Sequence, residues 1–130
     1  MYVQTYIYFY IHICLILQLR IMKLSIVIPA YNEGPTIHHI LDKVQKVELL
    51  NTIQKEIIIV NDCSKDNTEE AIKAYQSANP TMAVTYYKHD INQGKGAAIR
   101  TGIQKATGDW VIIQDADLEY DPEEYNILLK

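Results

Sequence analysis

The feature that most constrains the fold is an alternation, from Leu24 onward, between short runs of β-branched residues and segments with helical periodicity. Four apolar runs predict strands, at residues 24–29, 57–60, 84–87 and 110–114. The second run is apolar at every position, as in strands that are covered on both faces. The sequence therefore predicts an α/β fold, with a mainly parallel, twisted sheet flanked by helices on both faces.

The segments between these runs carry helix-start and helix-stop signals. We expect helices that begin at Gly34-Pro35, at Asn67, at Gly96 and near Pro122. The second of them has Asp66 and Glu69 at the spacing of a capping pair. Gly108 follows the third helix and is predicted to be its C-terminal stop.

Size, charge and cysteine content exclude several classes of protein. The chain has 130 residues and 48% hydrophobic residues, enough for one modest core. Its net charge is -4, and its basic residues are scattered, so nucleic-acid binding is not expected. The two cysteines, Cys14 and Cys63, have no disulfide or metal-ligand spacing, which favours a reducing, cytoplasmic compartment.

Residues 1–22 form an apolar extension before a domain that covers residues 23–130. Met1–Leu19 has no charged side chain and approaches the ~20 residues that span a bilayer. As an anchor it would be followed by Arg20 and Lys23, which would keep the domain at the cytosolic face of a membrane. As a secretory signal it lacks a basic start and a cleavage site. We favour a third interpretation, a misplaced start upstream of Met22.

Three acidic residues, Asp115, Asp117 and Glu119, follow the last predicted strand. Side chains alternate along an extended chain, so these three carboxylates can point the same way. Converging carboxylates repel one another unless a cation lies among them, and oxygen ligands favour Mg²⁺ or Mn²⁺, often together with substrate phosphates. The simpler alternative is that they shape turns, as Asp121 before Pro122 is expected to do.

Polar residues also follow the first two predicted strands, at residues 29–33 and at 61–62. Parallel strands end at one edge of a sheet, so these residues should meet the acidic stretch there. Tyr31 could contact a base or ribose, and Glu33 and Asp62 could accept hydrogen bonds from them. Each has an ordinary alternative, namely packing for Tyr31, a helix-start charge for Glu33 and a turn for Asp62. Their joint placement favours a nucleotide site.

A glycine-rich segment, residues 92–98, opens the third predicted helix. It is neither a dinucleotide fingerprint nor a P-loop, because Ile99 stands at the third glycine position and Gly96 where a P-loop has Ser or Thr. A turn that opens a helix has free N–H groups, which together with Lys95 favour an anion.

Four ordered motifs, at residues 25–33, 59–68, 92–97 and 115–119, resemble those of glycosyltransferase family 2. The branch they resemble most is that of the dolichyl-phosphate or polyprenyl-phosphate mannosyl- and glucosyltransferases. The resemblance covers about residues 23–130, the N-terminal, nucleotide-binding half of the family's domain. It implies a GT-A fold, a nucleotide-sugar donor (GDP-mannose or a UDP-sugar), a lipid-phosphate or glycan acceptor, Mg²⁺ or Mn²⁺, and inversion at the anomeric carbon.

The resemblance also implies roles for particular residues. The implied nucleotide-sugar site consists of Pro29, Ala30, Tyr31, Glu33, Asp62, Gly94, Lys95, Gln114, Asp115, Ala116 and Asp117. The implied metal ligands are Asp115, Asp117 and Glu119. Asn61 and Asn67 depart from the family, which commonly has Asp and Gly there, so the nucleoside contacts are expected to differ in detail. The catalytic base is expected beyond Lys130, so the chain alone should turn over weakly or not at all.

Three alternative functions remain open from the sequence. The first is a nucleotide-sugar-binding module or paralogue without catalysis of its own. The second is a nicotinamide-dependent oxidoreductase, against which the missing glycine fingerprint argues. The third is a nucleotidyltransferase, which usually has a glycine-rich loop after its first strand, where this chain has residues 29–33.

Overall fold

The structure is a computed structural model that describes residues 3–4, 6–9, 21–117 and 119–130. Most of the predicted N-terminal extension, including Cys14, lies outside the described residues, so its origin stays a prediction. In the part of the chain that is described, no helix is both long enough and apolar enough to cross a bilayer.

Four parallel strands form one sheet in the order β3-β2-β1-β4. The strands are β1 (Lys23–Ala30), β2 (Gln54–Asn61), β3 (Val84–Lys88) and β4 (Trp110–Ile113). β1 pairs with β2 along its whole length and with β4 on its other side. The mainly parallel α/β sheet predicted from the sequence is therefore confirmed, and the carboxyl ends of the strands share one edge.

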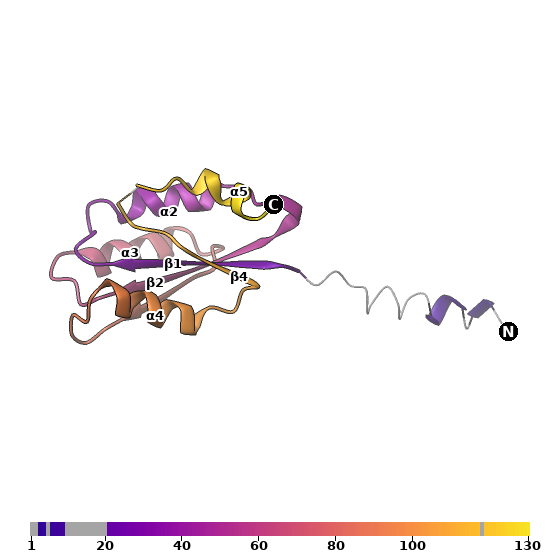
Figure 1. Ribbon diagram of the computed structural model, residues 1–130, viewed down its shortest axis with the longest axis horizontal. Helices are drawn as coiled ribbons and strands as arrows, with labels where there is room; N and C mark the ends of the chain where they lie inside the picture. The colour runs from indigo at the N-terminus through magenta and orange to yellow at the C-terminus, as the bar shows by residue number, and fades with distance from the viewer. Residues whose placement is uncertain (1–2, 5, 10–20, 118) are drawn as a thin grey trace.

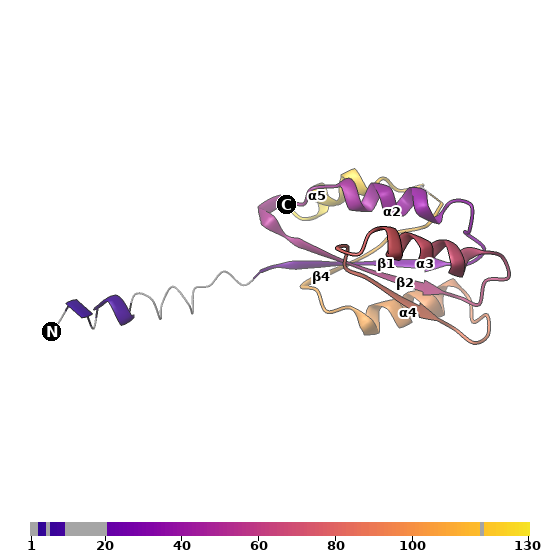
Figure 2. The ribbon, with the colours of Figure 1, turned by 180° about the vertical axis from the view of Figure 1, so that it is seen from behind.

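Helices cover both faces of this sheet. They are α2 (Ile37–Lys46), α3 (Thr68–Ala78), α4 (Lys95–Lys105) and α5 (Tyr125–Leu128), with short 3₁₀ turns η1 (Leu50–Thr52) and η2 (Pro122–Glu124). Figure 1 shows α2, α3 and α5 on one face and α4 on the other, and the view from behind in Figure 2 agrees.

The alternation of side chains along β1 divides the core between the two faces. Ile26 and Ile28 belong to the larger cluster, which includes Leu41 of α2. Val27 belongs to a smaller cluster with Ala98 of α4. All five side chains are fully buried. Both faces of β1 are covered, which explains the apolar run from Ile26 to Ala30.

The order of the strands creates a topological switch point between β1 and β4. The chain builds β1, β2 and β3 outward on one side of β1, and then α4 returns it across the other face so that β4 lies beside β1. In open α/β sheets, ligands bind at such a point, outside the carboxyl ends of the strands.

Two predictions about helix ends were wrong. Gly108 does not stop α4, which ends at Lys105 and continues into an extended Ala106. Instead Gly108 lies against β1, where an added Cβ would come within 2.8 Å of the Lys23 carbonyl oxygen. Asp66 and Glu69 do not form a reciprocal capping pair either. Asp66 accepts a hydrogen bond from the N–H of Thr68, whereas the carboxylate of Glu69 binds Lys73 and Lys88.

We expect Gly108→Ala to lower the free energy of unfolding by about 1–3 kcal/mol, the usual cost of overpacking. The new methyl would also lie 2.5 Å from the Ser25 hydroxyl, so β1 or β4 would have to shift. Gly96→Ala is the matched control, because its nearest neighbour would be the Arg100 side chain at 3.7 Å. It should stabilise α4 slightly, since alanine is the better helix former. Urea denaturation measures both, and equal stabilities would contradict the close approach at Gly108.

Candidate nucleotide-sugar and metal site

A pocket of about 350 Å³ opens at the switch point between β1 and β4. Its walls come from the ends of β1 and β2, the loop that opens α4, and the loop after β4. It is lined by Pro29, Ala30, Tyr31, Glu33, Asp62, Asn92, Gly94, Lys95, Ala98, Asp115, Ala116 and Asp117. The three polar clusters that the sequence places at strand ends thus face one cavity.

The pocket brings together ten of the eleven residues that the sequence assigns to a nucleotide-sugar site. Gln114 is the exception, since it does not line the pocket. Asn92 and Ala98 line it but were not singled out from the sequence. Both belong to the glycine-rich segment, so that segment already carried the signal for them.

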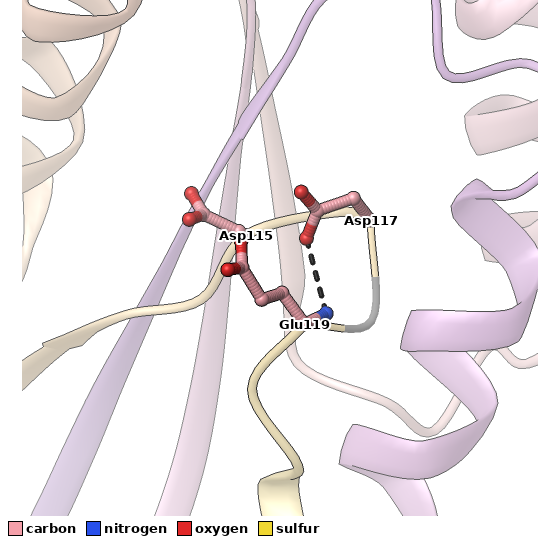
Figure 3. Close-up of side chains that lie close together, drawn as sticks. All are labelled: Asp115, Asp117 and Glu119. Atoms are coloured by element: carbon pink, nitrogen blue, oxygen red, sulfur yellow. Dashed lines mark hydrogen bonds between the residues drawn. The ribbon is translucent and has the colours of Figure 1, made fainter.

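Asp115, Asp117 and Glu119 form a compact acidic cluster (Figure 3). Asp115 and Asp117 line the pocket, whereas Glu119 is not among its lining residues. One carboxylate oxygen from each lies within 4.8 Å of the others. A turn brings them together rather than an extended strand, because β4 ends at Ile113 and the N–H of Glu119 donates to Asp117 Oδ1 at 3.1 Å. Three convergent oxygen donors fit a hard divalent ion such as Mg²⁺ or Mn²⁺.

Lys95, the first residue of α4, contacts this cluster. Its Nζ lies 2.6 Å from Asp115 Oδ1. The hydrogen bond to Asp115 raises the pKa of Lys95, and the charges of Asp117 and Glu119 act in the same direction. The lysine is therefore fully charged at neutral pH and carries positive charge into the pocket.

Two loops interlock beside the pocket, one after β1 and one after β2. The N–H of Asn32 donates to Ser64 Oγ at 3.0 Å, and the N–H of Lys65 donates to Asn32 Oδ1 at 2.8 Å. The N–H of Gly34 donates to Asp66 Oδ2 at 3.1 Å. Asn32 has a φ of 54°, a left-handed conformation that asparagine tolerates better than most residues. These bonds fix the path of the chain around Tyr31 and Glu33.

Tyr31 and Glu33 extend from the first of these loops. Tyr31 is 43% exposed, so its ring is accessible rather than packed in the core. The Glu33 carboxylate accepts a hydrogen bond from the Thr36 hydroxyl at 2.7 Å, and the Glu33 N–H donates to Thr68 Oγ1. The acidic group is thus oriented but keeps acceptor capacity for a ligand.

Asp62 is buried and ties the end of β2 to the loop before α4. Its Oδ1 accepts from the Gln93 N–H at 2.9 Å and contacts His89 Nδ1 at 2.7 Å, and its Oδ2 accepts from the Gly94 N–H at 2.7 Å. Burial raises the pKa of Asp62, but these hydrogen bonds outweigh burial and hold the pKa below its ordinary value. Asp62 is therefore a carboxylate at neutral pH whose first task is to shape the pocket wall.

His89 is the residue that sequence reasoning missed. Its side chain is almost fully buried, and its Nε2 lies 2.9 Å from the Thr101 hydroxyl of α4. It thereby joins Asp62 to α4. A single histidine without a recognisable spacing to a partner gives no sequence signal, so only the tertiary contacts reveal it.

Gln114 and Asn61 shape loops instead of lining the pocket. The amide of Gln114 donates to the carbonyl oxygens of Asp115 and Tyr120 at 3.1 and 2.9 Å, and its Oε1 accepts from the Tyr125 hydroxyl at 2.6 Å. Gln114 therefore holds together the two ends of the acidic turn. Asn61 Oδ1 accepts from the Ser64 N–H at 2.9 Å. Asn61, where the family commonly has Asp, therefore shapes the loop after β2 in this structure.

The sheet, its switch point and the acidic pocket define an α/β protein with a GT-A architecture. Residues 25–130 match the family described as "Glycosyl transferase family 2", and the chain belongs to this family. Over 104 residues it is 38% identical to the undecaprenyl-phosphate 4-deoxy-4-formamido-L-arabinose transferase of Yersinia pestis (strain Pestoides F). The match covers 80% of the chain and 32% of that relative, so the chain spans about a third of its length.

Two solved structures share the fold. One is the mannosyltransferase PcManGT from Pyrobaculum calidifontis in complex with GDP-Man and Mn²⁺, with a TM-score of 0.70 and 29% identity over 78% of this chain and 29% of that one. The other is S. aureus TarS 1–349 in complex with UDP, with a TM-score of 0.71 and 25% identity over 83% of this chain and 31% of that one. The family and the GT-A fold predicted from the motifs are thus confirmed.

Proposed function

We propose that this chain is the nucleotide-sugar-binding half of an inverting glycosyltransferase. The enzyme would move a sugar from GDP-mannose or a UDP-sugar to a polyprenyl or dolichyl phosphate, or to a glycan. The observation that carries this proposal is that the ends of β1 and β2 share one pocket with Asp115 and Asp117 of the acidic cluster, in a chain of this family. The nucleotides and Mn²⁺ named with the two solved structures support the donor class, and the relative's name supports a lipid-phosphate acceptor.

Asp115, Asp117 and Glu119 are the residues proposed to hold Mg²⁺ or Mn²⁺. A bound ion would supply Lewis-acid neutralisation of the departing diphosphate, worth several kcal/mol. Tyr31 and Glu33 are proposed to position the nucleoside, and Asp62 to hold the loop that faces it.

The acceptor decides how much acid–base chemistry the enzyme needs. A lipid phosphate is already anionic, so it needs positioning more than removal of a proton, whereas a hydroxyl of a glycan needs a general base. A lipid acceptor would also bring this cytoplasmic domain to the cytosolic face of a membrane.

A thermal-shift panel of GDP- and UDP-sugars, each with and without Mn²⁺, tests the proposal. A ligand at a hundred times its Kd adds about 2.7 kcal/mol to stability. For a domain of this size that corresponds to a rise in Tm of roughly 10 °C or more. We expect this rise only when nucleotide and metal are both present. NADH is included as a comparison ligand, and a shift with NADH alone would instead support the oxidoreductase alternative. A shift that does not need the metal would contradict the role of the acidic cluster.

A further inference from the structure

Lys95 lies where both a metal ion and a diphosphate are proposed to bind. It lines the pocket, and its ammonium is paired with Asp115, one of the three proposed metal ligands. Within the described part of the chain, no other ion pair involves a member of the acidic cluster. This inference rests on the proposed function, because it concerns how Lys95 responds when a metal ion and a nucleotide bind at that site.

The ion pair and a metal ion compete for the same carboxylate. The Lys95 ammonium lies 2.6 Å from Asp115 Oδ1, so it already neutralises a carboxylate whose negative charge a divalent ion would also need. A lysine and a divalent ion side by side would also repel each other. Occupation of the site therefore favours release of the Lys95 ammonium from Asp115.

Lys95 has the freedom to make this exchange. Its side chain is 61% exposed and has a flexible four-carbon stem, whereas Asp115 is only 19% exposed and stays in the wall. The released ammonium would remain in the pocket at the start of α4, where a diphosphate would bring several negative charges.

We propose that Lys95 is the internal counter-ion of the acidic cluster in the ligand-free protein, and that it moves from Asp115 to the donor's diphosphate when the metal ion binds. The lysine then couples the two binding events. Metal binding frees a cation for the nucleotide, and the nucleotide keeps that cation away from the metal ligand. Binding of the metal alone is opposed by the lysine, and binding of both ligands together is favoured.

The test replaces the charge and keeps the length of the side chain, with Lys95→Met. Lys46→Met is the matched control, because it removes the same charge from an exposed position at the end of α2. Calorimetry measures the affinity for Mn²⁺ alone, and then for GDP and UDP at saturating Mn²⁺. Denaturation in urea confirms that both variants are folded.

We expect opposite effects on the two ligands. Lys95→Met should bind Mn²⁺ alone about two- to fivefold more tightly, the range given by the strength of exposed ion pairs. It should bind the nucleoside diphosphate in the presence of Mn²⁺ roughly tenfold more weakly, because a charge-assisted hydrogen bond is lost. Lys46→Met should match the wild type in both measurements.

Unchanged or weaker Mn²⁺ binding by Lys95→Met would overturn the counter-ion role, while metal-dependent nucleotide binding by the wild type would leave the proposed function in place. Tighter Mn²⁺ binding with unchanged nucleotide affinity would overturn the transfer of Lys95 to the diphosphate. A wild type that binds neither Mn²⁺ nor nucleotide would overturn the proposed function, and this inference with it.

Discussion

Asp62→Ala should lower the free energy of unfolding by about 3–5 kcal/mol, because each donor that loses its acceptor in the protein interior costs about 1–3 kcal/mol. The variant leaves three groups without their carboxylate, namely the buried His89 Nδ1 and the partly buried N–H groups of Gln93 and Gly94. Urea denaturation measures the loss. Asp62→Asn should lose less stability than Asp62→Ala. Its amide oxygen can still accept a hydrogen bond, although its NH₂ group would face a backbone N–H donor.

Asp90→Ala is the control for this variant, because it removes an exposed carboxylate from the neighbouring loop. Its stability should remain within about 0.5 kcal/mol of the wild type. A loss below about 1 kcal/mol for Asp62→Ala would show that the loop before α4 does not depend on Asp62.

The lowered pKa of Asp62 also gives this prediction a pH dependence. The unfolded chain has an ordinary aspartate pKa of about 3.9, so the contribution of Asp62 is complete above that value. It is lost as the pH falls further, through the lower pKa of the folded protein. Glu56 and Asp66 also have lowered pKa values and add to the acid sensitivity. The stability of Asp62→Asn should therefore decline less steeply below pH 4 than that of the wild type.

Asp117→Asn combined with Glu119→Gln should weaken Mn²⁺ binding on the order of a hundredfold, because the affinity of such sites follows the number of charged ligands. The pair of Lys95 with Asp115 stays intact in this variant. Both changed side chains are exposed, so the free energy of unfolding should hardly change. Calorimetry with Mn²⁺, alone and with UDP or GDP, measures the effect.

Glu123→Gln combined with Glu124→Gln is the control for charge, since it removes two exposed carboxylates nearby in the sequence. Its Mn²⁺ affinity should stay close to that of the wild type. Equal losses in the two double variants would mean that overall charge, rather than the acidic cluster, governs cation binding.

Local sequence patterns were sufficient to predict the order and type of the main elements. Ile57–Val60 read as a buried strand because both of its faces are covered by helices. The start of β2 at Gln54 could not be read in the same way. The strand starts there because Gln54 pairs with Lys23 of β1. The first three residues of β2 are polar, so they lie outside the apolar run from which the strand was predicted.

The candidate site was predictable where residues of matching chemistry follow strand ends, as Asp115 and Asp117 do. It was not predictable where a side chain forms hydrogen bonds with residues that are distant in the sequence. Gln114 stands beside the acidic residues in sequence, yet it bonds Tyr125 and the backbone of the turn. His89 bonds Asp62 across 27 positions, a contact that only the folded chain creates.

The interlocked loops after β1 and β2 have a thermodynamic consequence for ligand binding. Fixing the backbone of one flexible residue costs roughly 1–2 kcal/mol in conformational entropy. The hydrogen bonds that join Asn32 to Ser64 and Lys65 form when the protein folds, before any ligand binds. Ligand binding therefore does not have to order the loops after β1 and β2. A nucleoside would therefore meet a preorganised surface, and its association should lack the large heat-capacity change that accompanies coupled folding.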